Sequence, residues 1–295
     1  MVKRPKFRLR LRSRTLILGE RTLVMGVLNV TPDSFSDGGK FLDPQLAIEQ
    51  AIAMERSGAD LLDLGGESTR PGSAGTPKET ELARILPVLH RLRGTLKIPI
   101  SIDTRKSEVA EAAIAAGAEI VNDVSGLESD PRIAEVAARR SVPLILMHMR
   151  GEPATMQKAP FARDVMKDVS SGLRASIAVA RKAGVRKSQI VIDPGIGFGK
   201  SFEQNYELLR KLPELANLGY PLLVGPSRKG FLGATLAKDG KSAPPEERIW
   251  ATAATVAASI LGGAHIVRVH DVPEMAQVAR VSDFILGVAG KRRQR

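Results

Sequence analysis

The chain has 295 residues, of which 43% are hydrophobic and 26% charged, and these ordinary values indicate a folded globular protein rather than a disordered chain. It contains no cysteine, which excludes a disulfide scaffold, thiolate metal sites and cysteine nucleophiles. The formal net charge of +12 is concentrated at the ends, because residues 1–14 contribute seven basic side chains and no acid, and residues 291–295 contribute four. Since the body between them is nearly neutral, we do not expect nucleic acid as a partner.

Two segments bear on contact with a membrane. The first residues lack an apolar run followed by a small-residue cleavage site, so we expect no signal peptide and a cytoplasmic protein. Residues 249–267 contain no Asp, Glu, Lys or Arg, but most are Ala, Thr, Ser or Gly, and Gly262 and Gly263 interrupt the stretch. This pattern favours a buried helix that leads into a core strand over a membrane-spanning helix.

The first 20 residues predict a short β-hairpin. Apolar and basic residues alternate from Phe7 to Arg12, and the apolar run 15–18 follows after a polar break. A period of two predicts strands with one buried and one solvated face.

From residue 21 onward, short apolar runs alternate with longer helical stretches. The eight runs lie at 23–28, 60–64, 98–102, 119–121, 142–147, 189–192, 221–224 and 265–269. The helices that we expect between and after them lie at 44–57, 78–93, 106–116, 131–140, 164–183, 202–211, 246–261 and 273–287.

The runs are apolar throughout, which is typical of parallel strands that are covered on both sides. Eight strand–helix units in a chain of this length predict an α/β fold, a (β/α)₈ TIM barrel with an N-terminal hairpin. An open doubly wound sheet is the alternative, but no GxGxxG pattern follows the first strand. We divide the chain into a basic hairpin segment (1–20), a single barrel (21–290) and a basic tail (291–295).

Polar or ionisable residues stand at the end of every predicted strand, where the chemistry of a (β/α)₈ barrel takes place. One such residue is often only a helix cap or a turn former. Eight ends with such residues predict one shared cleft. The cleft would contain two carboxylate acceptors, an amide and a fixed cation, which are Asp103, Asp193, Asn122 and Lys229. Such a set suits a flat polar heterocycle.

Other strand ends supply cationic donors, which suit a phosphate or diphosphate, and these are Arg70, Arg268 and His270. Asn29 offers a hard oxygen ligand for Mg²⁺ beside a diphosphate. The alternative is that Asn29 only forms a turn after the strand. The glycine-rich segment 195–200 lacks the spacing of a phosphate-binding loop and is better explained as a tight turn. His148 is open to a catalytic or a structural role.

The motifs at these strand ends resemble those of the bacterial dihydropteroate synthase family. They are MGVLNVTPDSFSDGG (25–39), DLGGESTRPG (63–72), SIDT (101–104), VND (121–123), DPGIGFGK (193–200), SRK (227–229) and RVHD (268–271). The resemblance implies a transferase of folate biosynthesis that joins 4-aminobenzoate to 6-hydroxymethyl-7,8-dihydropterin diphosphate, releasing 7,8-dihydropteroate and diphosphate. It also implies Mg²⁺ and a homodimer.

Carried over by motif position, the resemblance assigns three groups of residues. Asp103, Asn122, Asp193 and Lys229 would hold the pterin. Asn29, Arg70, Arg268 and His270 would hold the diphosphate, with Asn29 also facing the metal. Thr69, Phe35, Pro71 and Gly230 would lie near 4-aminobenzoate. Family members often carry Ser where Gly230 stands, so the hydroxyl is lost and only the backbone N–H remains.

Two other functions remain compatible with the motifs. One is the pterin-binding module of a corrinoid methyltransferase, which would need neither Arg70 nor Arg268 for a diphosphate. The other is a regulatory barrel that keeps the pocket without synthase activity, which the loss of the hydroxyl at Gly230 leaves open.

Overall fold

The computed structural model describes residues 4–31, 44–68, 73, 75–152, 155–156 and 162–288. In this part of the chain eight parallel strands pair in the order β8-β7-β6-β5-β4-β3-β10-β9. The bounds of these strands are β3 Leu23–Asn29, β4 Leu61–Gly65, β5 Ile100–Asp103, β6 Ile120–Asp123, β7 Leu144–Met147, β8 Ile190–Asp193, β9 Leu223–Val224 and β10 Ile266–Val269. A parallel bridge between Ile192 and Leu222 joins β8 to the segment before β9. The sheet is therefore nearly closed, which confirms the barrel and excludes the open doubly wound sheet.

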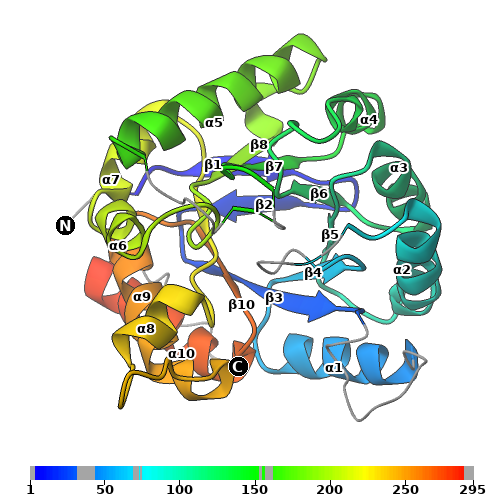
Figure 1. The fold of residues 1–295 in the computed structure, drawn as a ribbon. Helices are drawn as coiled ribbons and strands as arrows, with labels where there is room; N and C mark the ends of the chain where they lie inside the picture. The colour runs from blue at the N-terminus through cyan, green and yellow to red at the C-terminus, as the bar shows by residue number, and fades with distance from the viewer. Residues whose placement is uncertain are drawn as a thin grey trace.

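Helices surround the strands, as Figure 1 shows. The eight predicted helices are α1 Pro44–Arg56, α2 Lys78–Leu92, α3 Ser107–Ala116, α4 Arg132–Arg140, α5 Val165–Lys182, α6 Phe202–Arg210, α9 Ile249–Leu261 and α10 Val272–Leu286. The start of the predicted helix 246–261 is instead a 3₁₀ turn, η4 Pro245–Arg248. The short elements η2 Lys187–Gln189, α7 Leu212–Leu215, η3 Ala216–Leu218 and α8 Gly230–Thr235 were not predicted. They are too short to show a helical period.

The predicted hairpin is confirmed as the antiparallel pair β1 Phe7–Arg10 and β2 Thr15–Leu18. Leu9 and Leu18 are buried whereas Arg8 and Arg10 are exposed, as the alternation predicted. The two strands lie across one end of the barrel in Figure 1.

Inside the barrel, side chains change from apolar to polar along the strands. Near the strand starts they pack with the hairpin in one buried cluster, which contains Leu9, Leu11, Leu18, Leu23, Met25, Leu61, Ile120, Ile145, Val191, Leu223 and Ile266. Side chains of a strand alternate between faces, so the residue two positions further along points inward again. On four of these strands that residue is polar, namely Asp63, Asn122, Asp193 and Arg268, and β5 adds Asp103, which stands two positions after the buried Ser101. We call these five residues the polar layer.

The uncharged stretch 249–267 forms α9 and β10, as expected from its sequence. Among the described residues, no helix combines the length and the apolar character needed to cross a membrane.

Candidate active site

Arg268 on β10 joins acidic side chains from two other strands of the polar layer. Its Nε donates to Asp63 Oδ2 at 2.6 Å, and its Nη2 donates to Asp103 Oδ2 at 2.8 Å. Asp63 Oδ2 also accepts a hydrogen bond from Asn122 Nδ2 at 2.9 Å. Because Asp63 and Asn122 are almost completely buried, these charge-assisted bonds lie where solvent screens them little. The structure thus connects three residues singled out from separate strand ends: Arg268, Asp103 and Asn122.

Asp63 is the site residue that the sequence reasoning did not single out, although it lies within a matching motif. It is fully buried, and its Oδ1 has no hydrogen-bond partner among the described residues. An acidic residue inside the otherwise apolar strand Leu61–Gly65 is the signal that could have identified it. Asp63 was not predicted because only residues at the ends of strands were considered, and Asp63 stands two residues before the end of β4.

Burial and mutual charge control ionisation in the polar layer. Burial raises the pKa of Asp103, and the negative charge of Asp63 adds to this effect, whereas Arg268 opposes it. Burial also raises the pKa of Asp193 to about 6, although the Gly195 N–H, which donates to Asp193 Oδ1 at 2.7 Å, favours the carboxylate. Near neutral pH, Asp193 is therefore mostly ionised and accepts hydrogen bonds, but its pKa lies much closer to 7 than that of an ordinary aspartate.

Lys229 lies beside this layer, just before α8. Burial and then the positive charge of Arg268 lower its pKa to about 7, while Asp193 and Asp103 act in the opposite direction. Its Nζ also lies 3.7 Å from the centre of the Phe198 ring, in cation–π geometry. Since the charges of Asp193 and Asp103 act on Lys229, it lies close to two of the residues with which it was grouped from the sequence.

An apolar wall stands next to these polar groups. It is a separate buried cluster of Val124, Met147, Met149, Met156 and Phe198, which comes from the end of β7 and from the loops after β6, β7 and β8. Met and Phe side chains offer polarisable surface on which a flat ring can pack. Acceptors beside such a wall suit a planar heterocycle with N–H donors at its edge.

Asn29 lies at the other side of the polar layer, at the end of β3. A Cβ added at Gly65 would lie 3.4 Å from Asn29 Oδ1 and 3.5 Å from Asp103 Cβ, so the glycine leaves space between the two side chains. Asn29 thus faces the same mouth as Asp103.

His270 follows β10, and its Nδ1 lies 3.0 Å from Ser227 Oγ. Burial, followed by the positive charges of Arg268, Arg228 and Lys229, lowers the pKa of His270 to about 3. With its pKa lowered in this way, His270 is mostly neutral near pH 7 in the free protein. It can still donate one hydrogen bond from a ring nitrogen.

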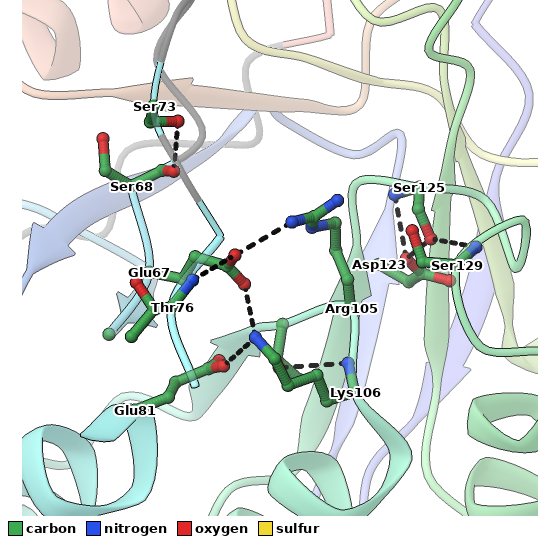
Figure 2. Close-up of polar contacts among 12 residues, drawn as sticks. Glu67, Ser68, Ser73, Thr76, Glu81, Arg105, Lys106, Asp123, Ser125 and Ser129 are labelled. Carbon is green, nitrogen blue, oxygen red and sulfur yellow. Dashed lines mark hydrogen bonds and ion pairs between the residues drawn. The ribbon is translucent and has the colours of Figure 1, made fainter. Parts of the chain in front are cut away.

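Charged side chains hold the loop after β4 against the loop after β5, as Figure 2 shows. Glu67 accepts from Arg105 Nη2 at 2.9 Å and from Lys106 Nζ at 2.7 Å, and Lys106 Nζ also lies 2.7 Å from Glu81 Oε2 on α2. Burial alone would raise the pKa of Glu67, but the hydrogen bonds from Lys106 and Arg105 outweigh it and lower the pKa. The network fixes the stem of the loop that begins with Glu67 and Ser68.

The glycine-rich segment after β8 forms a tight turn, as expected from its sequence. Gly195 has a φ of +67°, and a Cβ there would lie 1.9 Å from the carbonyl oxygen of His148, which no side chain can occupy. Lys200 Nζ donates to that same carbonyl oxygen at 2.9 Å and lies 3.0 Å from His148 Nδ1. His148 and Lys200 therefore tie the loops after β7 and β8 together, which favours a structural role for His148.

Four of the predicted residues lie outside the described residues, namely Phe35, Thr69, Arg70 and Pro71. Gly230 is described and is the first residue of α8, where it is exposed to solvent.

Comparison with known proteins gives consistent matches over most of the chain. Residues 25–270 match the family model described as pterin binding enzyme. The dihydropteroate synthase of Synechocystis is 52% identical over 90% of this chain and 91% of its own length, and that of Bacillus subtilis is 45% identical over 92% and 91%. A crystal structure of the Clostridium difficile dihydropteroate synthase in the presence of pteroic acid superimposes with a TM-score of 0.84 at 46% identity, covering 91% of this chain and 98% of that one. The Xanthomonas albilineans enzyme with 4-aminobenzoic acid gives a TM-score of 0.87 at 41% identity, covering 96% and 99%.

Proposed function

The chain belongs to the pterin-binding enzyme family and catalyses the dihydropteroate synthase reaction, and we propose that the mouth formed by the polar layer is where the reaction occurs. The reaction condenses 4-aminobenzoate with 6-hydroxymethyl-7,8-dihydropterin diphosphate to give 7,8-dihydropteroate and diphosphate. The observation that carries the proposal is Arg268, which links the acceptor side chains Asp63 and Asp103 and brings a half-buried cation to the same mouth.

The acceptors and the apolar wall suit the pterin. In our proposal Asp103, Asn122, Asp193 and Lys229 bind its polar edge, while Met147 and Phe198 support its face. Carboxylates that accept from ring N–H and amino groups fix one orientation of the heterocycle. The exocyclic methylene carbon is thereby presented toward the side where Asn29 and Arg268 lie.

The chemical step is a substitution at that methylene carbon. A bond forms between the aniline nitrogen and the carbon, the bond from the carbon to the diphosphate oxygen breaks, and the electron pair leaves with diphosphate. The attacking nitrogen then loses a proton to solvent. In our proposal Arg268 and His270 stabilise the charge that develops on the leaving group, together with Arg70 by family position. A neutral aniline needs no strong base, so catalysis rests on positioning and electrostatics.

Mg²⁺ is part of the proposal, with Asn29 as its protein ligand. The described residues contain no group of three or more His, Asp or Glu side chains arranged to hold a metal ion. The Oδ1 of Asn29 is a hard oxygen donor at the mouth, and the diphosphate and water would supply the other oxygens that Mg²⁺ requires. Bound there, the ion would neutralise part of the charge of the diphosphate.

A direct assay tests the proposed function. With purified protein, the pterin diphosphate and Mg²⁺, we expect release of diphosphate that depends on 4-aminobenzoate and stops when the metal is chelated. The product is identified as dihydropteroate by mass spectrometry. Release that proceeds equally without 4-aminobenzoate would show hydrolysis instead of condensation, and release that persists in excess chelator would remove Mg²⁺ from the proposal.

Replacing Gly230 by Ser is expected to improve binding of 4-aminobenzoate. A Cβ at Gly230 meets no atom within 4 Å, so the side chain fits without displacing a neighbour. One added hydrogen bond to a carboxylate is worth about 1.5 kcal/mol, which corresponds to a KM for 4-aminobenzoate lower by about tenfold. Steady-state kinetics with each substrate varied in turn measures the effect. An unchanged KM for 4-aminobenzoate, or an equal fall in the KM of the pterin substrate, would contradict the assignment of Gly230 to this pocket.

We also propose that the chain forms a homodimer through the outer faces of α9 and α10, which pack against each other. Exposed apolar side chains gather there: Trp250 is 79% exposed on α9, and Val281, Phe284 and Ile285 are 55–59% exposed on α10. The last three stand at helical spacing and form one stripe. Such a stripe of large apolar side chains marks an interaction surface.

Introducing a charge into this stripe is expected to break the dimer. Phe284→Glu should sediment as a monomer at concentrations where the parent chain sediments as a dimer, because a carboxylate would have to be buried in the interface. Leu46→Glu is the matched control, since Leu46 is a comparably exposed apolar residue on α1. A dimer that survives Phe284→Glu, or is lost equally in Leu46→Glu, would place the interface elsewhere.

A further inference from the structure

A cavity lies at the opposite end of the barrel from the polar layer. It has a volume of about 450 Å³, within the range of about 300–1,000 Å³ that is common for small-ligand clefts. It is lined by residues of β1, the end of α5, η2 and the segment before β9. Because η2 directly precedes β8 and the last segment precedes β9, the cavity faces the starts of the strands, whereas the polar layer faces their ends.

The cavity is strongly basic. Its lining includes Arg8, Arg181, Arg186 and Lys187 and no acidic residue. Within the described part of the chain, none of these four forms an ion pair. Some surface arginines elsewhere are neutralised, as Arg139 and Arg140 are by Glu111. The positive charge of the cavity is therefore not neutralised by the protein itself.

Two of the guanidinium groups are held in place by neutral acceptors. Arg181 Nη1 donates to the carbonyl oxygen of Val185 at 2.6 Å, and Arg186 Nε donates to Gln189 Oε1 at 2.8 Å. These contacts orient the side chains without cancelling their charge, and the other N–H groups of each guanidinium can donate to a ligand. A preorganised pair of this kind suits an anion with several oxygens.

The rest of the lining is apolar. Phe7, Leu9 and Pro221 contribute to the wall, and Leu9 and Pro221 are buried. Lys187 Nζ lies 5.3 Å from the centre of the Tyr220 ring, so this cation also borders an aromatic surface. The lining therefore offers a surface for a ring beside a group of cations.

We propose that this cavity binds a small organic anion that carries at least two negative charges next to a ring. A nucleoside diphosphate and an aromatic polycarboxylate share this chemistry. The site is separate from the proposed active site and does not depend on the reaction that takes place there. Because the four cations line one cavity of limited volume, a small molecule is favoured over a polynucleotide.

Calorimetric titration of the full chain tests the proposal with ADP and with benzene-1,3,5-tricarboxylate as separate probes. We expect at least one of them to bind, while adenosine, which lacks the charge, and inorganic phosphate, which lacks the ring, bind at least tenfold more weakly. Binding of ADP alone would identify an organic phosphate, and binding of the tricarboxylate alone an organic acid. If neither probe binds, the proposal is wrong.

Variants locate the binding. In the triple variant Arg181→Gln, Arg186→Gln, Lys187→Gln we expect the Kd of the bound probe to rise at least tenfold. The control Arg56→Gln, Arg174→Gln, Arg210→Gln removes the same charge from exposed positions outside the cavity and should keep the Kd within twofold. Equal loss in both triple variants would indicate only general electrostatic attraction and would overturn the proposal.

Two further outcomes count against the cavity. In our proposed function the barrel mouth also binds a diphosphate, and Arg268→Ala distinguishes the two sites. If ADP binds in the cavity, its affinity is unchanged in this variant. Loss of binding in Arg268→Ala would place ADP in the active site. A 20-nucleotide RNA that binds more tightly than either probe, and loses this affinity in the cavity triple variant, would assign the surface to nucleic acid.

Discussion

Replacing Arg268 with alanine is expected to lower kcat/KM by about 10³-fold, the upper end of what removal of a single oxyanion-stabilising donor costs. Arg268 Nε and Nη2 donate to Asp63 and Asp103 at 2.6 Å and 2.8 Å, and the same half-buried guanidinium is proposed to face the diphosphate. The substitution therefore removes a donor to the leaving group and leaves two buried carboxylates facing each other. Diphosphate release at saturating Mg²⁺ measures the loss.

The same substitution is expected to destabilise the fold. Removing one partner of a buried ion pair costs about 3–5 kcal/mol, because the remaining charge has lost its compensation. Arg268→Lys keeps the charge without the two-pronged geometry and should retain intermediate activity. Combining Arg268→Ala with Asp63→Asn removes one uncompensated carboxylate, and this pair of changes should recover stability but not turnover. Recovery of turnover in that double variant would mean that Arg268 acts only through the fold.

Arg21→Ala is the matched control for this experiment. Arg21 forms an ion pair with Asp60 close to the starts of β3 and β4, and its side chain is 54% exposed. An exposed pair of this kind contributes about 0–1 kcal/mol, so both stability and turnover should stay close to those of the parent chain. A loss of turnover comparable to that of Arg268→Ala would show that the assay reports general destabilisation.

The strands and long helices could be predicted because each leaves a local pattern. A run such as residues 142–147 is too apolar for a loop and too short for a helix, and the repeat of eight such runs specifies the barrel. The short helices α7 and α8 give no such pattern. Gly230–Thr235 contains two glycines and only one and a half turns, so its helical form depends on packing against neighbouring elements.

The candidate site was predictable only in part, because a hydrophobic run does not tell which side chains face the inside of the barrel. Asp63 and Leu64 are adjacent and both buried, yet Asp63 bonds Arg268 inside the barrel whereas Leu64 packs in the outer core. The strand-end rule found Asp103 and Arg268 and missed Asp63. The bond from Lys106 to Glu81 depends on how α2 packs beside the loop after β5, which no local pattern encodes.

Replacing Asp193 with asparagine is expected to weaken pterin binding and stabilise the free protein. A lost hydrogen bond to a charged group is worth about 1.5–3 kcal/mol, so the Kd of the pterin should rise by about 10- to 100-fold at pH 8. Burial raises the pKa of Asp193 from 3.8 to about 6, so the folded state binds more protons at this group than the unfolded state between these values. The free energy of unfolding therefore falls as pH rises through this window, and at pH 8 asparagine removes a penalty of about 2–3 kcal/mol.

The pH dependence separates this role from a purely structural one. In the parent chain, pterin affinity should fall as pH drops below about 6, because a protonated Asp193 accepts poorly. The variant should lack this transition and keep any change near pH 7 that comes from Lys229. Asp123→Asn is the matched control: burial also raises the pKa of Asp123 to about 6, but its oxygens accept from Ser125 and from the Leu127 N–H. This control loses the bond from the Leu127 N–H, because an amide nitrogen cannot accept it, while it sheds the same ionisation penalty. Its stability should therefore rise less than that of Asp193→Asn, and its pterin Kd should stay within about threefold. Fluorescence titration with the pterin between pH 5 and 8, alongside urea unfolding, distinguishes the two carboxylates. If the Asp193→Asn variant retains both the pterin affinity and the transition near pH 6, Asp193 does not belong to the pterin site.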